Sequence, residues 1–314
     1  MLLKQLITAY ELIDDPDASG ERVATCFNQL NPQIMPEVKT MEGDAGSTDF
    51  VKLLIPGAQG QTKGGIAPAL GIIGRLGGVG ARPGKIGAVS DADGAIVTIA
   101  MGLKLADMQQ KGDILNGDVI LATHICPNAP TIPHKPVPFM GAPVDMETMN
   151  QLEIDQAMDA ILSVDATKGN EVINNNSFAI SPTVKEGYIL RVSEDLLRIM
   201  RWVTGSPAVT FPLTTADITP YGNNLYHINS ILQPATATNR PVVGVATTSA
   251  KLVPGTSTGA NYPLGLESAA RFCVEVAKEF GQGSCQLYNR EEFRRITELY
   301  GSMRHLQTLG STGD

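Results

Sequence analysis

The sequence is poor in cysteine, in aromatic residues and in long apolar runs. Only 4 of 314 residues are cysteines, and no two of them form a Cys-x-x-Cys pair. This scatter excludes a disulfide framework and indicates a reduced protein inside the cell. The longest mostly apolar stretch, 95–103, stops at Lys104, so it is too short to span a bilayer. The first residues also lack the apolar core of a signal peptide. We therefore expect a cytoplasmic protein with no membrane partner.

Clusters of positive charge are also missing. The chain has 24 Lys and Arg against 32 Asp and Glu, which gives a formal net charge of −8. A protein that binds a phosphate backbone needs clustered basic side chains, so nucleic acid is not expected as a partner. The hydrophobic fraction of 43% and the charged fraction of 18% exclude intrinsic disorder. A chain of this length can bury a large core without disulfide support.

Short apolar runs alternate with helical patterns along the chain. Apolar spacing and capping residues predict helices at 3–13, 18–30, 94–109, 147–161, 193–203, 264–280 and 289–304. Apolar runs closed by turn residues predict two strands within 36–55 and further strands at 69–74, 117–126, 160–165, 207–213 and 242–247. Buried strands that alternate with helices form a largely parallel sheet covered on both faces. Because no linker or repeat divides the chain, we expect an α/β protein with a single three-layer α/β/α domain over 1–314.

Four strand ends in this chain carry polar side chains. They are Arg75, Asp91 with Asp93, His124 with Cys126, and Asp165. Ligands of open α/β sheets bind beyond the carboxyl ends of the strands, so these groups are expected to converge on one crevice if the strands are parallel. Asp91 has a simpler explanation, since a carboxylate at the start of a helix also caps free N–H groups.

His124 and Cys126 are two residues apart on a strand and therefore face the same side. Such a pair can chelate a metal or form a thiolate–imidazolium nucleophile. The alternative is structural, because buried cysteine behaves as a small hydrophobic residue and the histidine can simply be hydrogen-bonded. His134 lies in a loop rich in proline, whose extended bias can hold it over a pocket. His227 and His305 have no polar neighbours of this kind, and we interpret them as structural or surface residues.

A glycine-dense loop at 74–84 raises the question of dinucleotide binding. Gly78, Gly80 and Gly84 loosely match a G-x-G-x-x-x-G fingerprint. That fingerprint requires a helix that starts inside it and an acidic residue about 20 positions later. Pro83 leaves no room for such a helix, and Asp91 comes too early. A nicotinamide-dependent oxidoreductase is therefore the weakest of the functional hypotheses.

The order of segments resembles the dinuclear zinc aminopeptidase superfamily, especially its glutamyl and deblocking branch. The resemblance covers most of the chain, starting with the first two predicted helices and the segment 18–23 that opens the second one. The strand at 69–73 with Arg75 stands where that family has its His-x-Asp metal motif, and 90–96 resembles the segment of the metal-bridging aspartate. The strand at 117–123 continues like the one that ends in a Glu-Glu pair, and 163–169 resembles the segment of another aspartate ligand. The resemblance implies a mixed, largely parallel central sheet of the phosphorylase/hydrolase type, without the inserted β-domain common in the family.

The departures from this family concern its metal site. Arg75 stands in place of a histidine ligand, Gly77 in place of its orienting aspartate, and Cys126 with Pro127 in place of the Glu-Glu pair. No histidine occurs at 254–263, where a late ligand is expected. Only Asp91 and Asp165 match metal ligands of the family. A guanidinium offers donors and no acceptor, so it cannot coordinate a metal. We expect Arg75 to replace a metal by pairing with Asp91, Asp165 or a substrate carboxylate.

These observations predict a divergent protein of metallopeptidase fold that is not a standard dizinc aminopeptidase. One hypothesis is an atypical hydrolase of a small amide or peptide-like compound. In that hypothesis Cys126 and His124 are catalytic, Arg75 and His134 bind substrate, and Asp91 and Asp165 hold at most one divalent metal such as zinc. The alternative is a non-catalytic binding or regulatory protein that retains the fold and a small-molecule pocket. The partner is then a small-molecule or peptide-like ligand, and homo-oligomerisation stays open.

Overall fold

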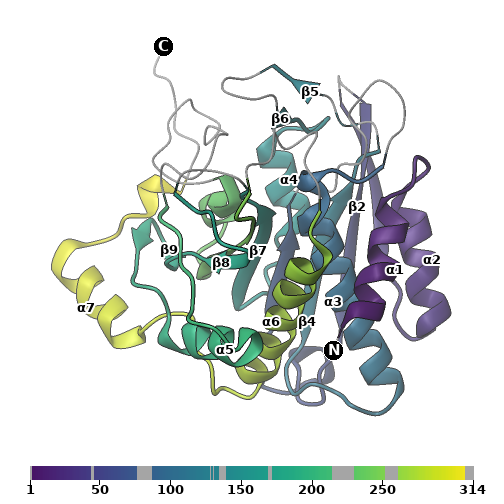
Figure 1. The fold of residues 1–314 in the computed structure, drawn as a ribbon. Helices are drawn as coiled ribbons and strands as arrows, with labels where there is room; N and C mark the ends of the chain where they lie inside the picture. Colours follow the sequence, from purple (N-terminus) through teal and green to yellow (C-terminus); the bar gives the residue numbers. More distant parts are fainter. Residues whose placement is uncertain are drawn as a thin grey trace.

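A mixed nine-stranded sheet forms the centre of the protein (Figure 1). The computed structural model describes residues 2–43, 46–75, 87–127, 129, 131–133, 139–168, 172–213, 230–251 and 261–307. The strand order is β1-β2-β4-β3-β7-β11-β9-β10, with β8 also paired to β11. The strands are β1 (Glu37–Gly43), β2 (Gly46–Ile55), β3 (Leu70–Gly74), β4 (Val119–Ile125), β7 (Ala160–Ala166), β8 (Ser177–Ile180), β9 (Val184–Lys185), β10 (Tyr188–Ile189) and β11 (Val242–Thr248).

Parallel pairing is confined to the four central strands. β4, β3, β7 and β11 run in one direction, whereas β1 and β2 on one side and β8, β9 and β10 on the other are antiparallel to their neighbours. The buried strands β3, β4 and β11 have no exposed residue, as expected for strands covered on both faces. The predicted α/β fold with a mixed, largely parallel central sheet is confirmed as a mixed sheet whose parallel strands are the four at its centre.

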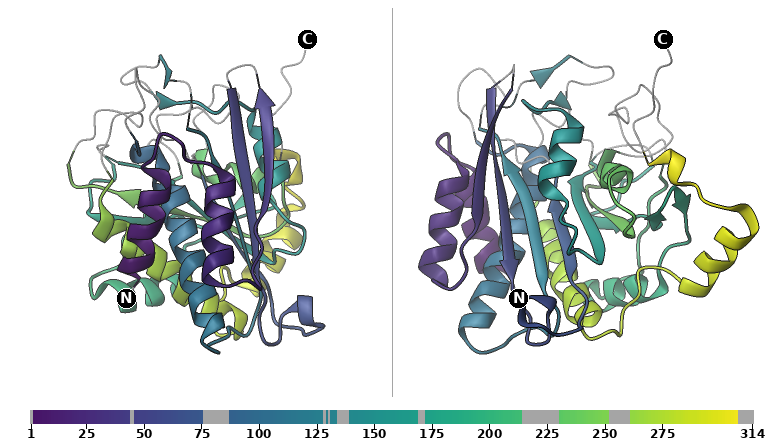
Figure 2. Two further views of the ribbon diagram at one scale, coloured as in Figure 1. Left: turned by 90° about the vertical axis from the view of Figure 1, so that its right-hand side faces the viewer. Right: turned by 180° about the vertical axis from the view of Figure 1, so that it is seen from behind.

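Helices cover both faces of this sheet (Figure 2). One face packs against α1 (Leu3–Ile13), α2 (Gly20–Leu30), α3 (Asp93–Gln110), α5 (Glu194–Thr204) and α6 (Pro263–Gly281). The opposite face carries α4 (Met146–Glu153) and the 3₁₀ helix η3 (Ser230–Thr236). The last helix, α7 (Arg290–Tyr300), has no buried residue. Shorter 3₁₀ turns occur at η1 (Gln61–Lys63), η2 (Ser90–Ala92) and η4 (Arg304–Leu306).

Helix α3 begins in close contact with the sheet. Thirteen of the residues from Gly94 to Met108, together with Asp93, are buried, so this helix lies in the interior and not at the surface. Gly94 allows the approach, because a Cβ at this position would lie 2.3 Å from the carbonyl oxygen of Arg75 and 2.5 Å from that of Val164. The start of α3 is therefore held directly against the carboxyl ends of β3 and β7.

Two predicted elements differ from the observed ones. The segment 207–213 is not a strand: Thr210 forms one isolated bridge with Ile180, because Pro207 and Pro212 cannot donate ladder hydrogen bonds. The helix predicted at 147–161 ends at Glu153. There the side chain of Asp155 accepts a hydrogen bond from the Ala157 amide at 3.0 Å, which stabilises a turn before β7.

Several short strands of the structure were not predicted from the sequence. β8, β9 and β10 extend the sheet beyond β11, and a small hairpin, β5 (Thr131–Ile132) with β6 (Phe139–Met140), lies within the proline-rich loop. Strands of two to four residues are too short to produce an alternating pattern. Among the described helices, none combines the length and the apolar character needed to cross a membrane.

Candidate functional site

Arg75, His124 and Asp165 lie at the ends of three neighbouring parallel strands. Gly74 of β3 pairs with Thr123 of β4 on one side and with Val164 of β7 on the other, so the three polar residues follow at matching positions. The Arg75 amide donates a hydrogen bond to the Val164 carbonyl at 2.7 Å, which continues the register past the strand end. The structure therefore brings these residues to the carboxyl edge of the sheet, where α/β proteins bind ligands.

A buried carboxylate, Glu153, connects Arg75 and His124. Its Oε1 lies 2.7 Å from His124 Nδ1, and its Oε2 lies 3.2 Å from Arg75 Nε. The three side chains are only 1–3% exposed. The Arg75 guanidinium also donates to Asn150 Oδ1, and its Nη1 lies 3.0 Å from the sulfur of Met146. The sequence predicts that Arg75 pairs with Asp91, Asp165 or a substrate carboxylate, whereas the carboxylate that contacts Arg75 in the structure is Glu153 on helix α4.

All three partners of Arg75 come from helix α4. Met146, Asn150 and Glu153 are spaced by four and three residues, which places them on one face of the helix. Asp145 fixes the start of this helix as its N-cap, accepting hydrogen bonds from the Thr148 amide at 2.8 Å and from the Thr148 hydroxyl at 2.9 Å. Helix α4 therefore presents one polar stripe to the end of β3.

The hydrogen bond to Glu153 sets the orientation of the His124 ring. When Nδ1 donates to a carboxylate, the neutral imidazole keeps its lone pair on Nε2. Nε2 of His124 is buried and has no hydrogen-bond partner among the described residues. The ring also packs against Phe50 of β2, with ring centroids 5.4 Å apart. This arrangement is that of a histidine prepared to accept a proton or a hydrogen bond at Nε2.

Cys126 lies just past the end of β4 in a small apolar cluster. Its neighbours are Val89, Ala129 and Met140, and the residue is 2% exposed. The thiol donates to the Ser47 carbonyl at 3.5 Å, whereas His124 bonds to Glu153. The structure thus places the two residues on one strand but gives each of them a separate hydrogen-bond partner. The role of Cys126 as a nucleophile stays a prediction.

A second buried ion pair lies at the start of helix α3. The ammonium group of Lys168 contacts Asp93 Oδ2, and the two side chains are 2% and 0% exposed. The Thr247 hydroxyl donates to the same oxygen at 2.7 Å, and the side-chain amide of Asn261 donates to Asp93 Oδ1. The ring of Tyr262 lies 5.4 Å from the Lys168 nitrogen. Asp93 therefore connects α3 to the segment after β7, to β11 and to the residues that precede α6.

The predicted metal ligands Asp91 and Asp165 are both buried. Asp91 lies in η2, directly before α3, and is 2% exposed. Asp165 lies in β7, is 6% exposed, and accepts a hydrogen bond from the Ala166 amide at 2.7 Å. Both therefore belong to the carboxyl edge of the sheet. His134 and the glycines Gly78, Gly80 and Gly84 lie outside the described residues.

The residues at this edge do not suit a pair of divalent metal ions. Such a pair needs several carboxylate or imidazole ligands with free lone pairs. Two of the four buried carboxylates, Glu153 and Asp93, are each bound to a basic side chain. Within the described part of the chain, no group of three or more His, Cys, Asp or Glu side chains has the arrangement of a metal site.

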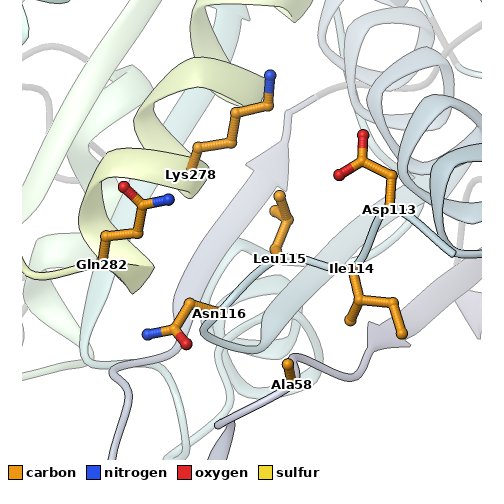
Figure 3. A pocket seen from close by; sticks show the side chains of 7 residues that line it. All are labelled: Ala58, Asp113, Ile114, Leu115, Asn116, Lys278 and Gln282. Atoms are coloured by element: carbon orange, nitrogen blue, oxygen red, sulfur yellow. The ribbon is translucent and has the colours of Figure 1, made fainter.

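A cavity of about 510 Å³ lies at the opposite edge of the sheet (Figure 3). Its lining comes from the loop before β4 and from the end of α6, and includes Asn116 and Lys278. The Asn116 side chain donates to the Gly281 carbonyl at 2.8 Å, and Lys278 pairs with Glu275 at 2.8 Å. Asn116 thus connects the loop to α6, and Lys278 is paired within that helix, so we place the candidate site at the carboxyl edge.

Two solved structures with a similar fold are a cytosol aminopeptidase and a bottromycin maturation enzyme. Cytosol aminopeptidase from Coxiella burnetii aligns with 13% identity and a TM-score of 0.51, over 88% of this chain and 68% of that one. The bottromycin maturation enzyme BotP in complex with Mn aligns with 12% identity and a TM-score of 0.50, over 87% of this chain and 70% of that one. At this identity the similarity establishes a metallopeptidase-like fold and leaves the chemistry of the site open.

The family of this chain is shown by a protein-family model that matches its sequence. A model described as "Protein of unknown function (DUF1177)" matches residues 39–310, so the chain belongs to that family. A search of the curated proteins found no match. The resemblance to the aminopeptidase superfamily is thus confirmed for the fold, and the assignment to its glutamyl and deblocking branch stays a proposal.

Sequence reasoning missed two residues of the site, Glu153 and Lys168. Glu153 is the last residue of α4, in a polar segment that is typical of a solvated helix end. Lys168 follows Asp165 by three residues within a segment that the sequence analysis did quote. A lysine next to buried strand residues is a weak signal on its own. The signal that could have found both is charge balance, because a buried Arg75 and a buried Asp93 each require an opposite charge.

Proposed function

We propose that this protein is an atypical hydrolase of a small amide or peptide-like compound, with its active site at the carboxyl edge of the sheet. The proposal includes descent from the glutamyl and deblocking branch and excludes the standard dizinc mechanism. The observation that carries it is the hydrogen bond between Glu153 Oε1 and His124 Nδ1, which lie 2.7 Å apart in two almost fully buried side chains. A carboxylate that orients a histidine is the arrangement by which hydrolases create a general base.

In this proposal His124 Nε2 is the base, and Cys126 is the nucleophile. The thiol proton passes to His124 as the sulfur attacks the amide carbon, and the same proton then passes to the leaving nitrogen. Water hydrolyses the resulting thioester and restores the thiol. Arg75 holds Glu153 in place through its contact at 3.2 Å. In the same proposal, Arg75 and His134 bind the substrate. Asp91 and Asp165 hold at most one divalent metal.

The test is hydrolysis of a panel of dipeptides, N-acyl amino acids and small amides. We expect His124→Asn to lower kcat/KM roughly 100-fold or more, since general base catalysis typically contributes that much. Glu153→Gln is expected to lower it as well, with a changed pH profile, because the orienting charge is lost. Cys126→Ala is expected to abolish turnover.

Two matched variants control for the change of residue type. His305→Asn replaces an exposed histidine of η4, and Glu147→Gln replaces an exposed glutamate on the same helix as Glu153. Both are expected to retain the activity of the unmodified protein. Full turnover by His124→Asn on a substrate that the unmodified protein cleaves would rule out the proposed base.

A second candidate function is non-catalytic binding of a small molecule or peptide. The observation that favours it is the enclosure of Arg75, Glu153 and His124, whose side chains contact one another through Glu153 and are only 1–3% exposed. Calorimetric titration with the same panel distinguishes the two functions. Binding of a panel compound with no turnover supports this candidate, and multiple turnover contradicts it.

A further inference from the structure

Two basic side chains lie buried at the carboxyl edge, and each is bound to a buried carboxylate. Arg75 follows β3 and pairs with Glu153 of α4. Lys168 follows β7 and pairs with Asp93 of α3. None of these four side chains is more than 3% exposed. A buried charge without an opposite charge is strongly destabilising, so each carboxylate and its cation must be retained together.

Both oxygens of Asp93 accept hydrogen bonds, whereas Glu153 is hydrogen-bonded at Oε1 and has only the ion-pair contact with Arg75 at Oε2. Asp93 accepts hydrogen bonds from the Thr247 hydroxyl and the Asn261 amide in addition to its contact with Lys168. Glu153 is bound on one oxygen by His124 and lies next to Arg75 on the other. A divalent ion would have to displace these donors. It would also be repelled by the resident ammonium or guanidinium, since like charges interact strongly at short range in a buried site.

We propose that Arg75 and Lys168 are built-in counter-cations of this site and that they take the place of divalent metal ions at Glu153 and Asp93. The positive charge of the site is then supplied by the chain itself, from two separate segments that meet at the sheet edge. This inference concerns the same site as the proposed function. It rests on the location of that site and does not require that the protein hydrolyses a substrate.

The first arm of the test uses the unmodified protein. Elemental analysis after purification and calorimetric titration with MnCl₂ and ZnCl₂ measure whether the full-length chain holds divalent metal. We expect at most one equivalent of bound metal with either salt, the one that the proposed function assigns to Asp91 and Asp165. A second equivalent of bound Mn or Zn, with a thermal midpoint that falls on chelation, would overturn the proposal.

The second arm tests the charge of Lys168. Lys168→Met leaves Asp93 buried without its cation, and we expect the thermal midpoint to fall by roughly 5 to 10 °C. The matched control is Lys52→Met, since Lys52 pairs with Asp155 at 3.4 Å in a partly exposed position. The control is expected to shift the midpoint by no more than roughly 2 °C. Equal midpoints for the two variants would show that Lys168 is not a required counter-ion.

A double variant keeps the proposal testable if Lys168→Met does not fold. Asp93→Asn combined with Lys168→Met removes both charges, and we expect it to be more stable than Lys168→Met alone, or to fold where that variant does not. A double variant less stable than the single variant would contradict the pairing. None of these measurements depends on hydrolysis, so a failure of the proposed function and a failure of this inference give different results.

Discussion

Thr98 on helix α3 is a buried hydroxyl without a hydrogen-bond partner among the described residues. It is 2% exposed and lines a very small void with apolar neighbours that include Phe27 and Leu121. An unsatisfied buried hydroxyl is unfavourable, because its hydration is lost and no bond replaces it. We therefore expect Thr98→Val to raise the free energy of unfolding by about 1 kcal/mol, measured by urea denaturation.

Thr123 offers a matched comparison on the neighbouring strand β4. Its hydroxyl is also buried, but it donates to the Gly74 carbonyl at 2.8 Å. Thr123→Val removes this bond, so we expect it to lower the free energy of unfolding by about 1 kcal/mol. If Thr98→Val were the more destabilising of the two, the interpretation of Thr98 as an unsatisfied group would be wrong.

At the residue scale, the sequence identified the strand-end residues but not their partners. Arg75, His124 and Asp165 were found because each lies at the carboxyl end of a recognisable apolar strand, and the parallel register then brings them to one edge. Glu153 is distant from all of them in sequence and reaches them only because α4 packs across the end of β3. Contacts of this kind depend on the packing of separate elements, which local patterns do not encode.

At the scale of elements, helix α4 carries the partners of Arg75, and its N-cap is Asp145. Hydrogen bonds from the Thr148 amide and the Thr148 hydroxyl hold the pKa of the Asp145 carboxyl below its usual value of 3.8. We expect Asp145→Ala to lower the free energy of unfolding by about 1 kcal/mol, as is typical for the loss of a cap. Chemical denaturation at neutral pH measures this change.

The direction of the pKa shift also predicts a pH dependence. Because the folded pKa lies below the unfolded one, the cap stabilises fully above pH 3.8 and loses its charge as the pH falls through the folded pKa. Asp145→Asn retains a side-chain oxygen that can cap but does not titrate. The difference in stability between the unmodified protein and Asp145→Asn should therefore shrink on acidification to about pH 3. A difference that grows on acidification would contradict the shift.

Most long elements could be predicted from the sequence, and the failures have local causes. Helices α1, α2, α3 and α6 begin and end within a few residues of the expected ranges because their apolar spacing and caps are clear. Ser19 caps α2 as expected, by accepting from the Arg22 amide at 3.4 Å. The segment 207–213 was predicted as a strand from its apolar composition. It does not form one, because Pro207 and Pro212 lack the N–H groups that sheet hydrogen bonds need.

At the scale of the whole molecule, the α/β class could be predicted, but the strand order could not. The alternation of apolar strands with helices requires a sheet covered on both faces. It does not show that β4 lies between β2 and β3, because strand order depends on contacts between distant segments. The fold is shared with a cytosol aminopeptidase and a bottromycin maturation enzyme at 12–13% identity, so the chemistry has to be argued from the site.

The central claim is that side-chain cations, and not metal ions, neutralise Glu153 and Asp93. The most direct test is a crystal of the full-length protein soaked in MnCl₂, with anomalous difference maps recorded at the manganese absorption edge. The account predicts no anomalous peak within coordination distance of either carboxylate, and it predicts Arg75 and Lys168 in contact with them. A manganese peak bound to Glu153 or Asp93, with the basic side chain displaced, would contradict it.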